Sequence, residues 1–369
     1  MSQRDSLLAE IYARPDDDAA RLVYADYLEE AGDPQGEFIR IQCQLARLPP
    51  YDPRRQPLED REDDLLAEWE TEWSGRIAEV AVEWEFRRGF IEFVELDPRR
   101  FLADPAAVFQ LAPVLHVQFG RREGTEDDGT TLDDAQAAEL ARLPQLARLR
   151  GLDVLYWEMR LNAAGVAAIV NSPWVTELRS LKCYCITNDY DFGQGFGLEG
   201  ARAIANSPNL TNLRSLDLGG NAIGGHGARL VLESTRYPDL ESLSFADDSY
   251  IHSDTAFRIA QAPFARSLKS LSLAASWLTA SAVQTLVESD SLQGLESLDL
   301  SSIALDEVAQ PESDLPESER RNAWRDGVVA ALSSPKLKRL RRLDLGQSEL
   351  SGERLEALVA RWGNVIKGS

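Results

Sequence analysis

Residues 213–218 read Leu213-Arg-Ser-Leu216-Asp-Leu218, and copies of this phrase run through most of the chain. The pattern L-x-x-L-x-L, or a close variant of it, occurs seven times. Its second leucine is Leu152, Leu181, Leu216, Leu243, Leu271, Leu298 and Leu343. These positions are 29, 35, 27, 28, 27 and 45 residues apart, so the basic period is near 28. Self-similarity at such a period predicts a repeat protein in which each copy is one supersecondary unit.

Each copy predicts one short strand followed by one helix. The alternation in L-x-L puts both leucines on one face of a strand, toward a core. The segments that follow have apolar residues at helical spacing, as in Ala282-Val283-Gln-Thr-Leu286-Val287. Several end in a pair such as Ser207-Pro208, where proline and polar residues stop a helix. We therefore expect an α/β solenoid whose stacked repeats share one core.

One repeat resembles a known class closely. Leu216-Asp-Leu218-Gly-Gly-Asn221-Ala-Ile223 is similar to the consensus of the ribonuclease-inhibitor-like leucine-rich repeats. In the other repeats the position of Asn221 holds Trp157, Ile186, Asp248, Ser276, Ile303 or Ser348. The resemblance covers roughly residues 90–362 and implies a horseshoe with parallel strands on the concave face and helices outside. Residues 91–96 and 114–119 are expected to begin the solenoid irregularly, and a helix at 354–362 to cap its end.

The first 75 residues lack the repeat. They predict short amphipathic helices at 5–14, about 17–31 and about 35–47, and another near 65–73. The phrase from Ala20-Arg-Leu-Val-Tyr24 to Gly36-Glu-Phe38-Ile39-Arg40 resembles the repeat-companion domain found in front of repeat proteins, chiefly in planctomycete bacteria. That resemblance implies no catalytic activity. We divide the chain into a helical companion domain, 1–75, and a solenoid, 76–369. The companion domain is either a cap that covers the exposed first strand of the solenoid or a separate docking module.

Composition limits the partners. The 61 acidic residues outnumber the 39 basic ones, for a formal charge of −22. This acidic surface disfavours nucleic acid and anionic membranes and favours a basic protein partner. No apolar stretch is long enough for a signal or a membrane span, so we expect a bacterial cytoplasmic protein. The three cysteines, Cys43, Cys183 and Cys185, are an odd number and are expected to be reduced thiols.

Three sequence patterns resemble nucleotide-binding or metal-binding motifs. Gly195-Phe-Gly197-Leu-Glu-Gly200 has the spacing of a dinucleotide motif, but Gly200 takes the place of Gly165 and Gly227 in neighbouring repeats. Asn188–Asp191 lacks the spacing of a calcium loop.

The pair Cys183 and Cys185 has no second cysteine pair with which to bind zinc, and the histidines are scattered. No nucleophile motif is present. We therefore expect a protein that is not an enzyme, with no catalytic residue, cofactor or metal.

A partner is expected on the concave face. The outward-facing strand positions selected for partner binding are Asp153, Lys182, Tyr184, Asp217, Ser244, Ser272, Asp299 and Asp344. Aromatic residues just past the strands are candidate anchors: Tyr156, Trp157, Tyr250 and Trp277. This small, acidic lining predicts a non-catalytic interaction scaffold or adaptor for a basic partner.

Two alternatives stay open. Some ribonuclease-inhibitor-like repeats act as GTPase activators, so the protein could regulate a nucleotide-hydrolysing partner. It could also dock through its N-terminal helical domain. The acidic insertions at 123–134 and 306–321 are either recognition loops or spacers.

Overall fold

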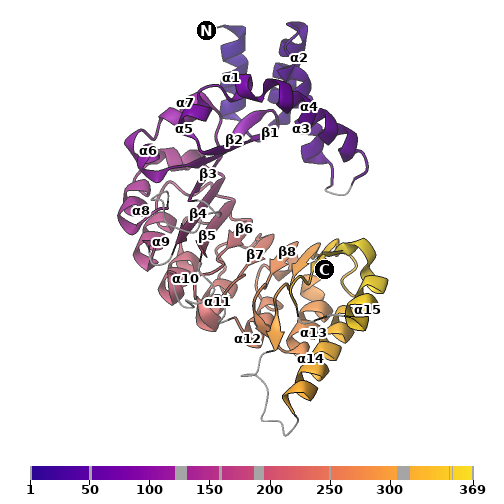
Figure 1. Ribbon diagram of the computed structural model, residues 1–369. Coiled ribbons are helices and arrows are strands. Elements are labelled where there is room, and N and C mark those ends of the chain that lie inside the picture. The colour runs from indigo at the N-terminus through magenta and orange to yellow at the C-terminus, as the bar shows by residue number, and fades with distance from the viewer. Residues whose placement is uncertain are drawn as a thin grey trace. The chain divides into compact units, whose positions relative to one another are not determined.

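The computed structural model describes residues 2–49, 52–120, 131–157, 160–186, 195–248, 251–305, 316–348, 350 and 352–367. Two compact units form the chain: the N-terminal unit, Met1–Phe119, and the repeat unit, Gly120–Ser369 (Figure 1). The position at 75/76, where the sequence suggested a domain boundary, lies inside the N-terminal unit.

The N-terminal unit begins with helices and continues into strands. Its elements are α1 (Gln3–Ala13), α2 (Asp18–Glu30), α3 (Gln35–Arg47), α4 (Arg55–Ser74), α5 (Ile77–Val80), β1 (Glu83–Arg87), β2 (Phe90–Leu96), α6 (Pro98–Ala103), α7 (Ala107–Leu111) and β3 (His116–Phe119). Helix α4 starts well before the expected helix near Leu65, because i,i+4 pairs such as Arg55 with Glu59 support the charged segment. Strand β2 pairs antiparallel with β1 and parallel with β3.

A tight turn at Arg88 and Gly89 joins β1 to β2. Both residues have positive φ, 51° and 88°, as a two-residue hairpin turn requires. A Cβ on Gly89 would lie 2.2 Å from Cγ1 of Ile39 on α3. The Gly89 N–H donates to Oε1 of Gln42 at 2.5 Å, so this turn is fixed against α3.

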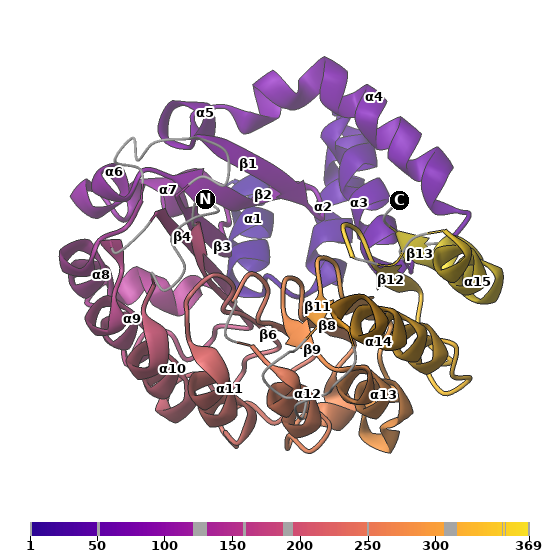
Figure 2. The same cartoon turned by 60° about the horizontal axis from the view of Figure 1, so that its bottom comes forward.

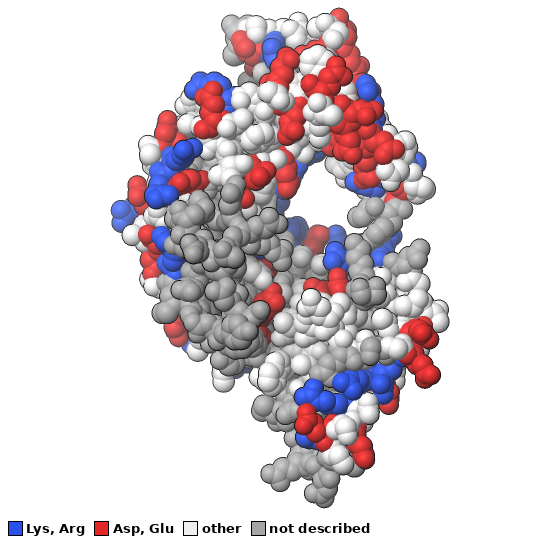
Figure 3. Space-filling view, in the orientation of Figure 1, with Lys and Arg blue, Asp and Glu red and all other residues white. Residues whose placement is uncertain are grey.

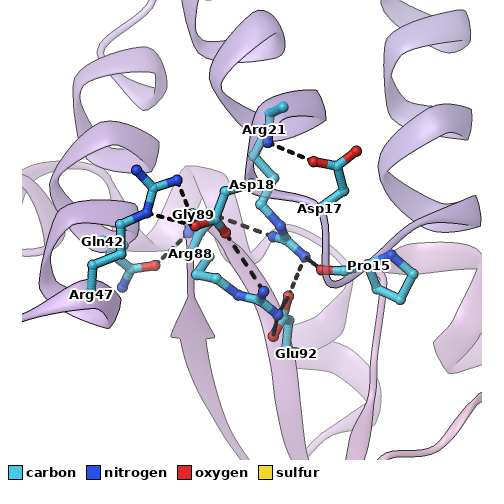
Figure 4. A network of polar contacts seen from close by, with 10 residues as sticks. Pro15, Asp17, Asp18, Arg21, Gln42, Arg47, Arg88, Gly89 and Glu92 are labelled. Atoms are coloured by element: carbon cyan, nitrogen blue, oxygen red, sulfur yellow. Dashed lines mark hydrogen bonds and ion pairs between the residues drawn. The ribbon is translucent and has the colours of Figure 1, made fainter.

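A buried polar network joins α2 to the same hairpin (Figure 4). The side chain of Arg21 is fully buried and forms an ion pair with Glu92 on β2. Its Nη2 also donates to the Pro15 carbonyl at 2.8 Å and its Nη1 to the Arg88 carbonyl at 3.1 Å. Burial lowers the pKa of Arg21 and raises the pKa of Glu92, and the opposite charges of the pair limit both shifts. This network places the hairpin in the same unit as the helices.

The repeat unit alternates strands and helices. Its helices are α8 (Asp134–Leu140), α9 (Ala163–Val170), α10 (Gly197–Asn206), α11 (Gly224–Leu232), α12 (Ser253–Ile259), α13 (Ala280–Glu288), α14 (Glu317–Leu332) and α15 (Glu353–Trp362). Its strands are β4 (Gly151–Trp157), β5 (Ser180–Ile186), β6 (Ser215–Asp217), β7 (Ser242–Ser244), β8 (Ser270–Ser272), β9 (Trp277–Leu278), β10 (Ser297–Asp299), β11 (Ala304–Leu305), β12 (Arg342–Asp344) and β13 (Ile366–Lys367). Short 3-10 turns occur at Pro144–Arg148, Ala265–Ser267, Asp290–Leu292 and Gly363–Val365. The strands lie along one side of this unit and the helices along the other (Figures 1 and 2).

The sheet is parallel in the order β4-β5-β6-β7-β8-β10-β12-β13. The second leucine of each phrase pairs with the second leucine of the next, from Leu152 to Leu343. All seven of these leucines are at most 1% exposed. The expected α/β solenoid, with a mostly parallel sheet and helices, is therefore confirmed for this unit.

The same backbone turn follows five of these strands. The fourth residue after the second leucine has a left-handed φ of 53° to 73° in Gly220, Asp247, Ala275, Ser302 and Gln347. The N–H of each of the first four donates to a carbonyl of the next repeat at 2.8–3.0 Å. The unusual conformation is thus part of the ladder that joins neighbouring repeats, and four of the five residues adopt it with a side chain.

Serines after the helices also join repeats. Ser172, Ser207 and Ser234 are buried. Their hydroxyls donate to carbonyls at the end of the preceding helix, at 2.6, 2.5 and 2.7 Å, in Ala141, Val170 and Ala205. The Ser-Pro pairs that predict helix ends therefore also carry contacts between repeats.

Candidate protein-binding surface

The middle residues of the parallel strands form one row across the sheet, here called the central row. It consists of Asp153, Lys182, Asp217, Ser244, Ser272, Asp299 and Asp344, each in register with the next. All seven are partly exposed, whereas the apolar residues on either side of them are buried and point into the core. The structure thus brings together seven of the twelve residues selected from the sequence.

Three of the four aspartates of the central row also hold the turns that follow their strands. Oδ1 of Asp217, Asp299 and Asp344 accepts a hydrogen bond from the N–H two residues later, at 3.1, 3.0 and 3.1 Å. Oγ of Ser244 and Ser272 accepts the equivalent N–H at 3.3 and 3.5 Å. Short polar acceptors favour such local turns. The recurrence of Asp or Ser at one repeat position was the sequence signal for this role, which the sequence analysis missed.

Neighbouring side chains contact the second carboxylate oxygens. Oδ2 of Asp217 lies 3.6 Å from Nζ of Lys182, and Oδ2 of Asp299 accepts from Oγ of Ser272 at 2.9 Å. Oδ2 of Asp344 is 3.2 Å from Nη2 of Arg342. Asp299 is bonded only to neutral groups in these contacts, so the central row keeps an excess of negative charge.

Tyr184 lies next to the central row but is held across two repeats. Its hydroxyl forms a hydrogen bond with the carboxylate of Asp247, and Nζ of Lys182 lies 5.5 Å from its ring centroid. The ring covers Gly219, where a Cβ would lie 2.6 Å from Cε2. The absence of a side chain at Gly219 thus makes room for a tyrosine that links the repeats.

Trp277 is the one predicted aromatic anchor whose side chain falls within the described residues. It is 38% exposed and lies on β9, which pairs with β11 in a small separate sheet rather than in the central row. The His252 ring packs edge-on against it with centroids 5.9 Å apart. The side chains of Tyr156 and Trp157, all of Tyr250, and residues 123–130 and 306–315 of the two insertions lie outside the described parts.

The cysteines and histidines do not gather into a reactive centre in the described ranges. Cys43, Cys183 and Cys185 are free and buried, and burial raises the pKa of the Cys183 thiol. No cluster of three His, Cys, Asp or Glu side chains suited to a metal ion occurs in that part of the chain. Nor does any helix described there combine the length and hydrophobicity needed to cross a bilayer.

Comparison with known proteins gives similarity of structure only. No protein-family model and no curated protein sequence matches the chain. The tropomodulin C-terminal domain of Caenorhabditis elegans is 16% identical with a TM-score of 0.32, over 46% of this chain and 92% of that one. A Bacteroides fragilis protein is 12% identical with a TM-score of 0.32, and the match covers 69% of this chain and 79% of that one. A chain of the yeast Rad7–Elc1 complex is 10% identical with a TM-score of 0.39, and the match covers 100% of this chain and 93% of that one. Likenesses this weak assign no function.

Proposed function

We propose that the protein is a non-catalytic interaction scaffold that binds a basic segment of another protein along the central row. The observation that carries this proposal is the register of Asp153, Asp217, Asp299 and Asp344 on one partly exposed strand face. Adjacent strands are about 4.8 Å apart, so a partner lying across them meets these carboxylates in a line.

The turns support this proposal because they hold the carboxylates in place before a partner arrives. A side chain already fixed by hydrogen bonds loses less conformational entropy when it is bound. Its charge also accelerates association with a basic surface, an effect that salt weakens. Trp277, exposed and packed on His252, offers an apolar contact of the kind that carries binding energy at interfaces.

The proposal includes the finer points that the sequence raised. The repeat unit is a leucine-rich-repeat horseshoe of the ribonuclease-inhibitor-like class with the central row on its concave face. The segment 1–75 is a planctomycete-type companion domain, and the protein acts in a bacterial cytoplasm. The turn at Asn221 supports the class, because Nδ2 of this buried asparagine donates to the carbonyls of Cys183, Leu218 and Gly219 at 2.7–2.9 Å.

The test is the triple variant Asp217→Asn, Asp299→Asn, Asp344→Asn. Asparagine keeps the Oδ1 acceptor that holds each turn and removes only the charge. A matched control neutralises three exposed helix carboxylates instead: Glu199→Gln, Asp254→Asn, Glu288→Gln. Both variants change the net charge equally.

Binding is measured with a short oligoarginine peptide at several salt concentrations and by quantitative capture from lysate. We expect the strand variant to weaken peptide binding about tenfold, or about 1.4 kcal/mol, and the helix variant to keep it. Proteins captured by the native chain and the helix variant should be lost from the strand variant. Equal loss in both variants would mean that the net charge, and not the central row, attracts basic ligands.

A further inference from the structure

A cavity in the N-terminal unit is separate from the central row. Its volume is about 220 Å³, and α1, α2, the start of α3, the end of α4, and strands β1 and β2 contribute to its wall. At the roughly 30 Å³ that a water molecule occupies in the liquid, this space holds about seven waters. It therefore suits a molecule of the size of a small amino acid.

Charges of both signs line this cavity, and among the described residues Arg4 forms no ion pair with either carboxylate of the wall. Arg4 on α1, Asp33 before α3 and Glu72 on α4 all belong to its wall. Most arginines of this unit form ion pairs, such as Arg40 with Glu29, but no ion pair joins Arg4 to a carboxylate within the ranges described. The wall thus presents a cation and two anions around one hollow.

Hydrogen bonds fix the orientation of two of these charges. Nε of Arg4 donates to the hydroxyl of Tyr24 at 3.1 Å, and the terminal nitrogens of the guanidinium make no hydrogen bond within the part of the chain that the structure describes. Oδ1 of Asp33 accepts the N–H of Gln35 at 2.9 Å, and Oδ2 has no such contact there. Each group therefore keeps bonding capacity for a ligand.

Tyr24 does not cancel the charge of Arg4. The tyrosine is 1% exposed, and burial raises the pKa of its phenol. Its hydroxyl therefore stays protonated and accepts from Arg4 as a neutral group. The hydrogen bond from Arg4 to Tyr24 in turn raises the pKa of the guanidinium.

Aromatic rings also belong to the wall, although polar atoms form most of the surface that faces the cavity. The wall includes the rings of Trp73, Phe86 and Phe90. Phe86 and Trp73 pack edge-on with centroids 6.4 Å apart, and Tyr24 lies 6.0 Å from Phe90. These rings offer a limited apolar contact, enough for a short hydrocarbon side chain.

Acidic side chains gather over α4 on the face that Figure 3 shows, and Glu72 lies near the end of that helix. The exposed acidic residues of α4 include Asp60, Asp63, Asp64, Glu68 and Glu70. Their field favours the approach of a positively charged group. A ligand with an ammonium group is consistent with this surface, and Arg4 adds the requirement for an anion.

We propose that this cavity binds a small zwitterion, namely a free α-amino acid with a short apolar side chain. Arg4 binds its carboxylate, Asp33 and Glu72 bind its ammonium group, and the aromatic wall contacts its side chain. A bidentate contact with a guanidinium suits a carboxylate. This inference is independent of the proposed function of the repeat unit.

The test is isothermal titration of the full chain with L-valine, L-alanine and L-leucine. Isobutylamine and 3-methylbutanoate serve as probes that keep the hydrocarbon of valine and lack one of its charges. We expect at least one amino acid to bind and both single-charge probes to bind at least tenfold more weakly. No binding of any of the three amino acids overturns the proposal, and so does equal binding of either probe.

Three variants locate the site. Arg4→Gln and Asp33→Asn should each raise the Kd for the amino acid about tenfold, while asparagine at position 33 keeps the Oδ1 acceptor for Gln35. Arg14→Gln is the control, because Arg14 follows α1 and pairs with Glu10 and Asp17 away from the cavity wall. Unchanged binding in Arg4→Gln, with an unchanged thermal midpoint, would also overturn the assignment.

Discussion

The N-terminal unit joins α2 to the β1–β2 hairpin by a buried ion pair that occurs once, whereas the repeat unit uses the same contacts in repeat after repeat. Arg21 and Glu92 are 71 residues apart in the chain. In the repeat unit, the leucine register, the left-handed turns and the serine hydrogen bonds recur at nearly constant intervals. Stability is therefore concentrated in a few residues of one unit and spread over many in the other.

The strongest way to test this contrast is Arg21→Met. The variant leaves the buried carboxylate of Glu92 with only the partly exposed Arg88, at 3.2 Å, as a cationic partner among the described residues. Because losing one partner of a buried ion pair is costly, we expect a loss of about 3 kcal/mol in the free energy of unfolding. Cysteines report each unit separately, with Cys43 in one and Cys183 and Cys185 in the other. Alkylation is pulsed at increasing urea concentrations. The urea concentration at which Cys43 becomes reactive should fall in the variant, and that for Cys183 and Cys185 should stay the same.

Two further variants control this experiment. Arg47→Met removes an exposed ion pair with Asp18 and should cost at most about 1 kcal/mol. Adding Glu92→Leu to Arg21→Met should recover part of the loss, because the most deeply buried carboxylate is then gone and Arg88, which is partly exposed, keeps Asp18 at 3.6 Å. If the double variant were less stable than Arg21→Met, the pair would not be the source of the effect.

The second prediction compares equivalent positions of two repeats. Asn221→Ala leaves three buried carbonyls without their donor and should cost about 1–3 kcal/mol. Ser276 holds the position of Asn221 two repeats further on, and its buried hydroxyl has no hydrogen-bond partner in the described structure. Ser276→Ala should therefore be neutral or slightly stabilising in thermal unfolding. A large loss in Ser276→Ala would show that the two positions have similar roles after all.

The third prediction uses the recurrent left-handed turn. Gly220→Ala should destabilise the protein by about 1–2 kcal/mol, because the new Cβ would also lie 2.1 Å from the carbonyl oxygen of Cys185. Ala275 already adopts φ 56°, so Ala275→Gly should relieve strain and stabilise by about 0.5 kcal/mol after the entropy cost of glycine. Chemical denaturation gives the free energy of unfolding of both variants. Changes of the same sign would contradict the claim that both positions adopt the same left-handed turn.

The last prediction concerns an effect confined to alkaline pH, which is absent near neutrality. Burial raises the pKa of Cys43 to about 11 from its ordinary value of 9.0. The neutral thiol is therefore favoured in the folded state, and its contribution to stability is complete below pH 9 and declines as the pH rises toward 11. Cys43→Ala should remove this decline in urea titrations between these pH values, whereas an identical decline in the variant would assign it to other groups.

The sequence predicted the elements that depend on local pattern. The alternation around Leu216 and Leu298 gave the strands, their buried face and the outward position of Asp217 and Asp299, because side-chain direction follows from a period of two. The extension of β4 and β5 to seven residues and the added β9–β11 sheet were not predicted, since they depend on pairing with neighbours.

Contacts between distant residues could not be read from pattern either. Nothing near Arg21 identifies Glu92 as its partner, and nothing near Tyr184 identifies Asp247, 63 residues later. Left-handed φ at Ala275 and Gln347 also escaped prediction, because these residue types do not favour it. The cavity beside Arg4 was missed because residues from six helices and two strands, distant in the sequence, form its wall.

The serine hydrogen bonds between neighbouring repeats have a consequence for the evolution of the gene. Each hydroxyl donates only to the end of the preceding helix. A copied or deleted segment such as 179–213, which carries both a donor, Ser207, and an acceptor, Ala205, would therefore find an equivalent partner at both ends. Duplication within the gene can therefore change the number of repeats, and with it the reach of the surface, without requiring a new set of compatible residues.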